Sequence, residues 1–273
     1  GVLNDLARFI AYRTNKPFAV ATTAPSMDGY ASVGSPLIIG KKKVTHQCKY
    51  PYGIFADTSV MKDAPVIMIK AGFGDILGKL TAIADWKLAN IIEGEYYCET
   101  VIKLVKNAVA KCIESTDGLV ERKDEAIGFL IEALILTGIS MGLVGMSRPA
   151  SGTEHQLAHY WELKAIEKGI DHPLHGNAVG TCTLVTAMLY ELAAADGLVP
   201  EGIEYPTVKY IRDLLEKVDA VTNPKDLNVD RDMFIDGMLN AMYFRKKYTI
   251  LQFLSDRGKL EEYTNILARR FYD

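Results

Sequence analysis

The sequence of 273 residues is poor in cysteine and tryptophan and has no excess of charge of one sign. Its four cysteines (Cys48, Cys98, Cys112 and Cys182) are widely spaced without a CxxC pair, which excludes a disulfide framework and is typical of free core thiols. The 31 basic and 34 acidic residues leave a net charge of −3, too little positive charge for a dedicated nucleic-acid or anionic-lipid binder. No signal peptide opens the chain, so a reducing, cytoplasmic location is expected.

Long hydrophobic runs are also scarce. The run at residues 126–146 contains Glu132 as its single formal charge and is long enough to cross a bilayer. A lone glutamate inside a membrane is costly, and we find no second such segment and no flanking aromatic belt. We therefore predict a core helix that is buried all round, and no membrane span.

Hydrophobic spacing divides the chain into two parts. Helical spacing at residues 2–10 precedes a buried strand at 18–21, segments 36–40 and 44–48 predict a hairpin, and 53–56 predicts another strand. Strand signals then end, and the remaining pattern is helical. The sequence predicts a mainly α protein, with part of an α/β domain at residues 1–66 and an all-helical domain at 67–273. The helical windows are 76–93, 97–115, 124–145, 154–168, 178–195, 207–218, 230–243, 248–256 and 260–271.

Histidines are concentrated in one region, because four of the five lie between positions 155 and 175. Ser151 and Glu154 match a capping box, so Ser151 is expected to cap a helix that carries His155 and His159 on one face. Two histidines at this spacing can share a metal, or one can bind while the other acts beside it. The glutamate of an HExxH motif is missing. A hydrogen-bonded histidine pair without metal is the open alternative.

Two further residues complete a possible metal site. His175 lies in a tight connection between two helices and could return against His155. The third ligand should be a carboxylate, and the best candidate is Asp75, interpreted as lying in the first turn of a helix after a glycine-rich approach. The alternative for Asp75 is plain stabilisation of the helix start. Such a site suits zinc, nickel or ferrous iron.

Two loops could bind other ligands. Residues 22–29 follow the strand at 18–21, where α/β proteins place ligands, although an ordinary turn has the same composition. Residues 1–5 are similar to the end of a phosphate-binding turn that enters a helix. The basic triplets at 41–43 and 245–247 are interpreted as a hairpin tip and as helix-end cations.

Taken together, four stretches resemble a known family. They are residues 23–32 (TAPSMDGYAS), 72–79 (GFGDILGK, with Asp85 and Trp86), 147–162 (SRPASGTEHQLAHYWE) and 175–176. They resemble the sn-glycerol-1-phosphate dehydrogenases, in the superfamily of metal-dependent glycerol dehydrogenases, iron-type alcohol dehydrogenases and dehydroquinate synthases. The resemblance covers residue 1 to at least residue 180. In that family further strands precede the glycine-rich loop, so the N-terminal strands of the dinucleotide-binding fold are expected to be absent from this chain.

The resemblance implies a role for particular residues. Asp75, His155 and His175 would bind the metal, Asp28, Asp75 and His159 would contact the substrate, and Asp75 and His159 would act in catalysis. His46 and His172 receive no role. The residues expected to contact the nicotinamide dinucleotide are Gly1, Val2, Leu3, Asn4, Asp5, Thr23, Ala24, Pro25, Ser26 and Ser32.

The activity so implied is hydride transfer between NAD or NADP and C2 of dihydroxyacetone phosphate, which gives sn-glycerol 1-phosphate. A divalent metal (Zn, Ni or Fe) would assist, and a homo-oligomer is expected. One alternative is a glycerol dehydrogenase or another metal-dependent dehydrogenase that acts on an unphosphorylated alcohol. Another is a non-catalytic helical scaffold that keeps its histidines from an ancestor.

Overall fold

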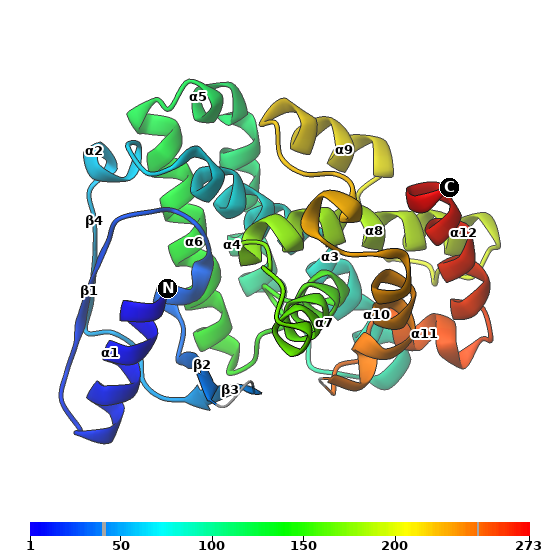
Figure 1. Cartoon of the computed structure of the whole chain (residues 1–273), viewed down its shortest axis with the longest axis horizontal. Helices are drawn as coiled ribbons and strands as arrows, with labels where there is room; N and C mark the ends of the chain where they lie inside the picture. Colours follow the sequence, from blue (N-terminus) through cyan, green and yellow to red (C-terminus); the bar gives the residue numbers. More distant parts are fainter. Residues whose placement is uncertain (40–41, 245) are drawn as a thin grey trace.

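The computed structural model describes residues 1–39, 42–244 and 246–273, and it joins a small α/β piece to a helical body (Figure 1). Helix α1 (Val2–Arg13) precedes strand β1 (Ala19–Thr22), which pairs in parallel with β4 (Gly53–Ala56). Strands β2 (Gly34–Ile39) and β3 (Lys42–Gln47) form the expected antiparallel hairpin. Gly40 and Lys41 of the hairpin and Arg245 of the second basic triplet lie outside the described residues.

The helical body confirms the prediction of a mainly α protein, because each predicted helical window contains a helix. The short helices α2 and α5 and the two 3-10 turns were not predicted. The elements are α2 (Thr58–Met61), α3 (Val66–Glu93), α4 (Glu99–Glu114), α5 (Thr116–Val120), α6 (Asp124–Val144), α7 (Thr153–Lys168), α8 (His175–Ala195), α9 (Val208–Lys217), α10 (Arg231–Phe244), α11 (Ile250–Asp256), α12 (Leu260–Tyr272), η1 (Asp28–Ala31) and η2 (Pro224–Leu227).

Helix α3 begins at Val66, ten residues before its predicted start. Its glycines do not interrupt the helix but allow other backbone segments to approach it. A Cβ atom on Gly72 would lie 1.8 Å from the carbonyl oxygen of Pro25, and one on Gly74 would lie 2.4 Å from that of Gly176. Asp75 therefore lies in the third turn of α3, and the interpretation of this carboxylate as a helix-start residue is wrong.

Helix α7 also begins differently from the prediction. Its N-cap is Gly152, which has no side chain to act as a cap, so the expected cap by Ser151 is wrong. Glu154 does reach back, but its Oε1 accepts a hydrogen bond from the backbone N–H of Gly152 at 2.6 Å. The buried carboxylate of Asp85 on α3 accepts the next N–H, that of Thr153, at 2.7 Å. This bond fixes the start of α7 against α3.

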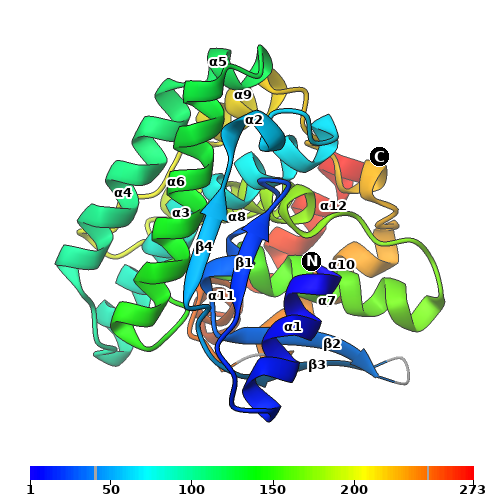
Figure 2. The same cartoon turned by 90° about the vertical axis from the view of Figure 1, so that its left-hand side faces the viewer.

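Helix α8 runs through the middle of the helical body beside α3 and α7, whereas α6 lies at the edge of that body (Figures 1 and 2). Both helices have the length and apolar composition that a membrane span requires, so the expectation of a single such segment is wrong. In the most apolar part of each helix, 78% of α8 but only 44% of α6 is buried. Ile139 and Leu143 of α6 are 43% and 65% exposed, which corrects the expectation of burial all round.

Candidate metal and substrate site

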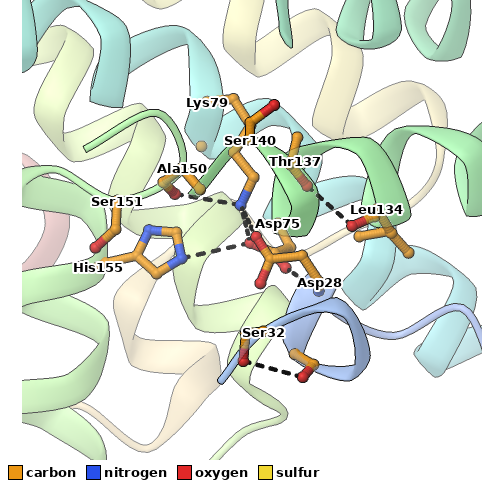
Figure 3. A network of polar contacts seen from close by, with 12 residues as sticks. Asp28, Ser32, Asp75, Lys79, Leu134, Thr137, Ser140, Ala150, Ser151 and His155 are labelled. Atoms are coloured by element: carbon orange, nitrogen blue, oxygen red, sulfur yellow. Dashed lines mark hydrogen bonds and ion pairs between the residues drawn. The ribbon is translucent and has the colours of Figure 1, made fainter. Parts of the chain in front are cut away.

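Polar side chains from separate segments of the sequence, among them Asp28, Asp75, Lys79 and His155, come together beside η1 (Figure 3). Helix α3 supplies Asp75, α7 supplies His155, and His175 is the first residue of α8. One potential ligand atom from each of these three residues lies within 4.8 Å of the others. The ring centroids of His155 and His175 are 5.2 Å apart. The structure thus places side by side the three residues that the resemblance assigns to the metal.

The imidazole of His155 is held from both sides. Its Nε2 lies 3.4 Å from Asp75 Oδ1, and its Nδ1 lies 2.8 Å from Glu154 Oε1. Burial lowers the pKa of His155, but the hydrogen bonds to Asp75 and Glu154 outweigh burial and raise it. Glu154 is itself fully buried, and its other oxygen, Oε2, accepts a hydrogen bond from Thr81 Oγ1 at 2.8 Å. A carboxylate on Nδ1 leaves Nε2 to face Asp75, which is how outer carboxylates orient metal-binding histidines.

This role of Glu154 cannot be read from the sequence, where the residue fits half of a capping box. The pKa of Glu154 tends upward on burial, but the hydrogen bond and charge of His155 outweigh this and lower it. The one local signal was its place directly before a candidate ligand.

Lys79 lies one turn after Asp75 on α3, and its ammonium is fully buried. Its Nζ donates to Asp75 Oδ1 at 2.6 Å, to Asp28 Oδ2 at 2.9 Å and to the carbonyl oxygen of Ala150 at 3.2 Å. Burial alone would lower the pKa of Lys79, but Asp28 and Asp75 outweigh it and raise the pKa. Lys79 belongs to the motif at residues 72–79, but the sequence alone indicates no function for it.

The two carboxylates beside Lys79 differ in their electrostatics. Burial raises the pKa of Asp75, but the charges of Lys79 and the neighbouring histidines outweigh burial and hold the pKa far below its usual value. For Asp28, burial and then the charge of Asp75 raise the pKa. The backbone N–H of Asp28 donates to Asp75 Oδ2 at 2.9 Å, so η1 is fastened directly to α3.

His159 lies one turn after His155 on the same helix and stacks on His175, with ring centroids 4.9 Å apart and planes 27° apart. Its Nδ1 lies 3.5 Å from Glu162 Oε2, and His159, Glu162 and His175 form a second group of potential ligand atoms within 4.8 Å. His155 is buried, whereas His159 and His175 are partly exposed. The cluster is therefore more accessible toward His159.

The residues expected to contact the dinucleotide lie on two segments. Residues 23–26 connect β1 to η1, and the Ser32 hydroxyl, just after η1, donates to the carbonyl oxygen of Gly29 at 3.1 Å. Gly1 is the N-cap of α1, and residues 2–5 form its first turn. The buried guanidinium of Arg8 links the two segments, since it donates to the carbonyl oxygens of Gly29 at 2.8 Å and Gly34 at 2.7 Å.

The two histidines without an expected role have other contacts. His46 packs against Phe9, with ring centroids 4.9 Å apart. His172 is exposed, and its Nδ1 is within 3.1 Å of the carbonyl oxygen of Pro173.

Two imidazoles and one carboxylate form a donor set that suits a divalent transition metal, with room for a further ligand. The contact in which Glu154 Oε1 accepts from His155 Nδ1 supports this fit, because a metal-binding imidazole needs a fixed orientation. The residues present therefore fit the metal that the family implies.

The fold defines the class of protein. The family model of iron-containing alcohol dehydrogenase matches residues 1–65. Glycerol dehydrogenase from Schizosaccharomyces pombe superposes with a TM-score of 0.63 at 18% identity, over 97% of this chain and 68% of that one. Maleylacetate reductase from Rhizobium sp. strain MTP-10005 gives 0.66 at 15% identity, over 98% and 71%. The chain has the fold of the iron-type alcohol dehydrogenases.

Relatives that are similar in sequence identify the family within this class. The chain is 41% identical to a glycerol-1-phosphate dehydrogenase [NAD(P)+] from Bacillus subtilis over 95% of its own length and 69% of that protein. It is 33% identical to one from Thermococcus kodakarensis, over 92% and 67%. The chain belongs to the glycerol-1-phosphate dehydrogenase family, and it spans about two thirds of the length of these relatives.

Proposed function

We propose that this protein interconverts dihydroxyacetone phosphate and sn-glycerol 1-phosphate, with NAD or NADP as the hydride carrier. The observation that carries the proposal is the Asp75, His155 and His175 cluster, oriented by Glu154, in a chain of this family. The relatives from Bacillus licheniformis and Bacillus subtilis, both named glycerol-1-phosphate dehydrogenase [NAD(P)+], support the substrate and the cofactor. An unphosphorylated polyol is the less supported substrate.

In this proposal Asp75, His155 and His175 hold a divalent metal, which acts when bound as a Lewis acid on the C2 oxygen. The carboxylate of Asp28 accepts a hydrogen bond from a substrate hydroxyl. Asp28 is held in position by Lys79 Nζ, which donates to its carboxylate, and by its own backbone N–H, which donates to Asp75. His159, on the accessible side, donates to or accepts from the alcohol oxygen and can carry its proton. Residues 1–5, 23–26 and Ser32 would hold the dinucleotide, which would supply or accept the hydride exchanged with C2.

We also propose that two parts of the chain bind different ligands. Residues 1–66 belong to the dinucleotide-binding part and residues 67–273 to the metal- and substrate-binding part. The family model that ends at residue 65 and the start of α3 at Val66 support this division. We propose that the protein works in the cytoplasm as a homo-oligomer, a state that would cover the exposed apolar residues of α6.

The reaction can be tested with the full-length gene product after dialysis against chelator and addition of zinc or nickel. Oxidation of NADH and of NADPH is followed with dihydroxyacetone phosphate and, separately, with dihydroxyacetone. We expect turnover that requires both the metal and the phosphate. Turnover of dihydroxyacetone alone would favour a glycerol dehydrogenase, and no turnover with either would favour the scaffold.

The role of Glu154 predicts a specific loss of metal affinity. In Glu154→Gln the amide can still hydrogen-bond to His155, but it no longer places a negative charge on Nδ1. We expect zinc to bind about 10-fold more weakly, at the lower end of outer-shell effects, as measured by competition with a chelating dye. Glu167→Gln, at an exposed position on the same helix, is the matched control. Equal zinc affinity in the two variants would contradict the assignment.

A further inference from the structure

The ammonium of Lys79 has no exposed surface, and each of its three hydrogens has an acceptor in the structure. The acceptors belong to three segments: Asp75 on α3, Asp28 on η1 and Ala150 in the connection between α6 and α7. That connection leads directly into the helix that carries His155. One side chain thus joins the pieces of the site that come from different parts of the chain (Figure 3).

The charges around Lys79 are unusual for a protein interior. Asp28 and Asp75 are both buried, and their carboxylates share this single ammonium. Removing one partner from a buried ion pair is costly, because the remaining charge loses its compensation without regaining water. Without Lys79 two carboxylates would face each other, and the direct bond from the Asp28 N–H to Asp75 would have to hold against their repulsion.

The oxygen that Lys79 binds on Asp75 also lies beside His155 of the candidate metal site. Asp75 Oδ1 is 2.6 Å from Lys79 Nζ and 3.4 Å from His155 Nε2. This carboxylate oxygen therefore lies close both to the buried cation and to a candidate ligand nitrogen.

We propose that Lys79 is the internal counter-ion of the site, a positioning residue that keeps Asp28 and Asp75 assembled while no metal is bound. The inference rests on the proposed metal role of Asp75, but not on the substrate. A bound divalent cation compensates Asp75 from the histidine side, so the protein depends on the Lys79 charge most strongly when it is free of metal.

The test is the melting temperature (Tm) of Lys79→Met, measured in chelator and in saturating zinc. We expect the variant to lose on the order of 10 °C in chelator and much less in zinc, so the gap between the two conditions widens relative to the unmodified protein. Lys70→Met, on the same helix, is the matched control, because Lys70 pairs with the exposed Asp219. The control gap should not change.

A double variant separates charge from packing. Asp28→Asn combined with Lys79→Met removes one negative and one positive charge, so the net charge of the trio is restored. We expect its gap in Tm to return toward that of the unmodified protein. If Lys79→Met does not fold in chelator, recovery of folding by zinc or by Asp28→Asn supports the proposal.

An equal loss of Tm in chelator and in zinc would overturn the proposal, and so would a double variant as unstable as Lys79→Met in both conditions. Either result would make Lys79 a packing residue. Because the readout is Tm and not turnover, it is independent of the substrate. Zinc stoichiometry, measured on the same samples, reports separately whether the metal site exists.

Discussion

Replacing His175 with alanine is expected to remove the bound metal and, with it, all dehydrogenase turnover. The substitution leaves only Asp75 and His155 from the cluster, and it also removes the ring on which His159 stacks. The loss of zinc affinity should exceed the roughly 10- to 100-fold effect of an outer-shell change, because a direct ligand is lost. Metal content after dialysis and initial rates with dihydroxyacetone phosphate measure the two effects.

Two matched variants make this result specific. His172→Ala changes an exposed histidine in the same connection and should keep both metal and turnover. His159→Ala should keep the metal but lose most of the turnover, since His159 lies outside the Asp75, His155 and His175 group. Stoichiometric metal in His175→Ala would show that the ligand assignment is wrong.

The sequence predicted the longer helices from helical spacing and the breakers between them, and it predicted the paired strands at 18–21 and 53–56 from short apolar runs. The sequence did not predict that α3 begins at Val66. Within a short stretch of sequence, Gly72 and Gly74 look like a loop that leads into a helix. In the structure their lack of a side chain allows the backbone of Pro25 and Gly176 to come close to them. These partners lie about 50 and 100 positions away in the chain, so no local pattern contains them.

The candidate site shows the same limit. Residue type and spacing made Asp75 and the clustered histidines candidates, because few side chains can bind a transition metal, and the resemblance to the family then selected Asp75, His155 and His175. Glu154 and Lys79 were not chosen, since a glutamate at a helix start and a lysine within a helix are ordinary features. Their roles come from burial and from partners such as Thr81 and Ala150 on other segments.

The contact between α3 and α8 leads to the second large expected effect, that of Gly176→Ala. A Cβ atom at this position would lie 1.9 Å from the carbonyl oxygen of Ala71 and 2.5 Å from its carbonyl carbon. Both are backbone atoms of α3, so no side chain can turn away, and the start of α8 must move. We expect a loss of about 3 kcal/mol or more in the free energy of unfolding, at or above the upper end for overpacking.

The same movement should weaken metal binding, because His175 precedes Gly176 and Asp75 is four residues beyond Ala71 on α3. Chemical denaturation in chelator and zinc titration measure the two effects separately. Gly128→Ala is the matched control: its Cβ would meet only Thr58 Cγ2, at 3.7 Å, inside helix α6. The control should gain up to about 1 kcal/mol from higher helix propensity. If Gly176→Ala matched the control in stability and in zinc affinity, the close approach of α8 to α3 could not be what positions His175 against Asp75.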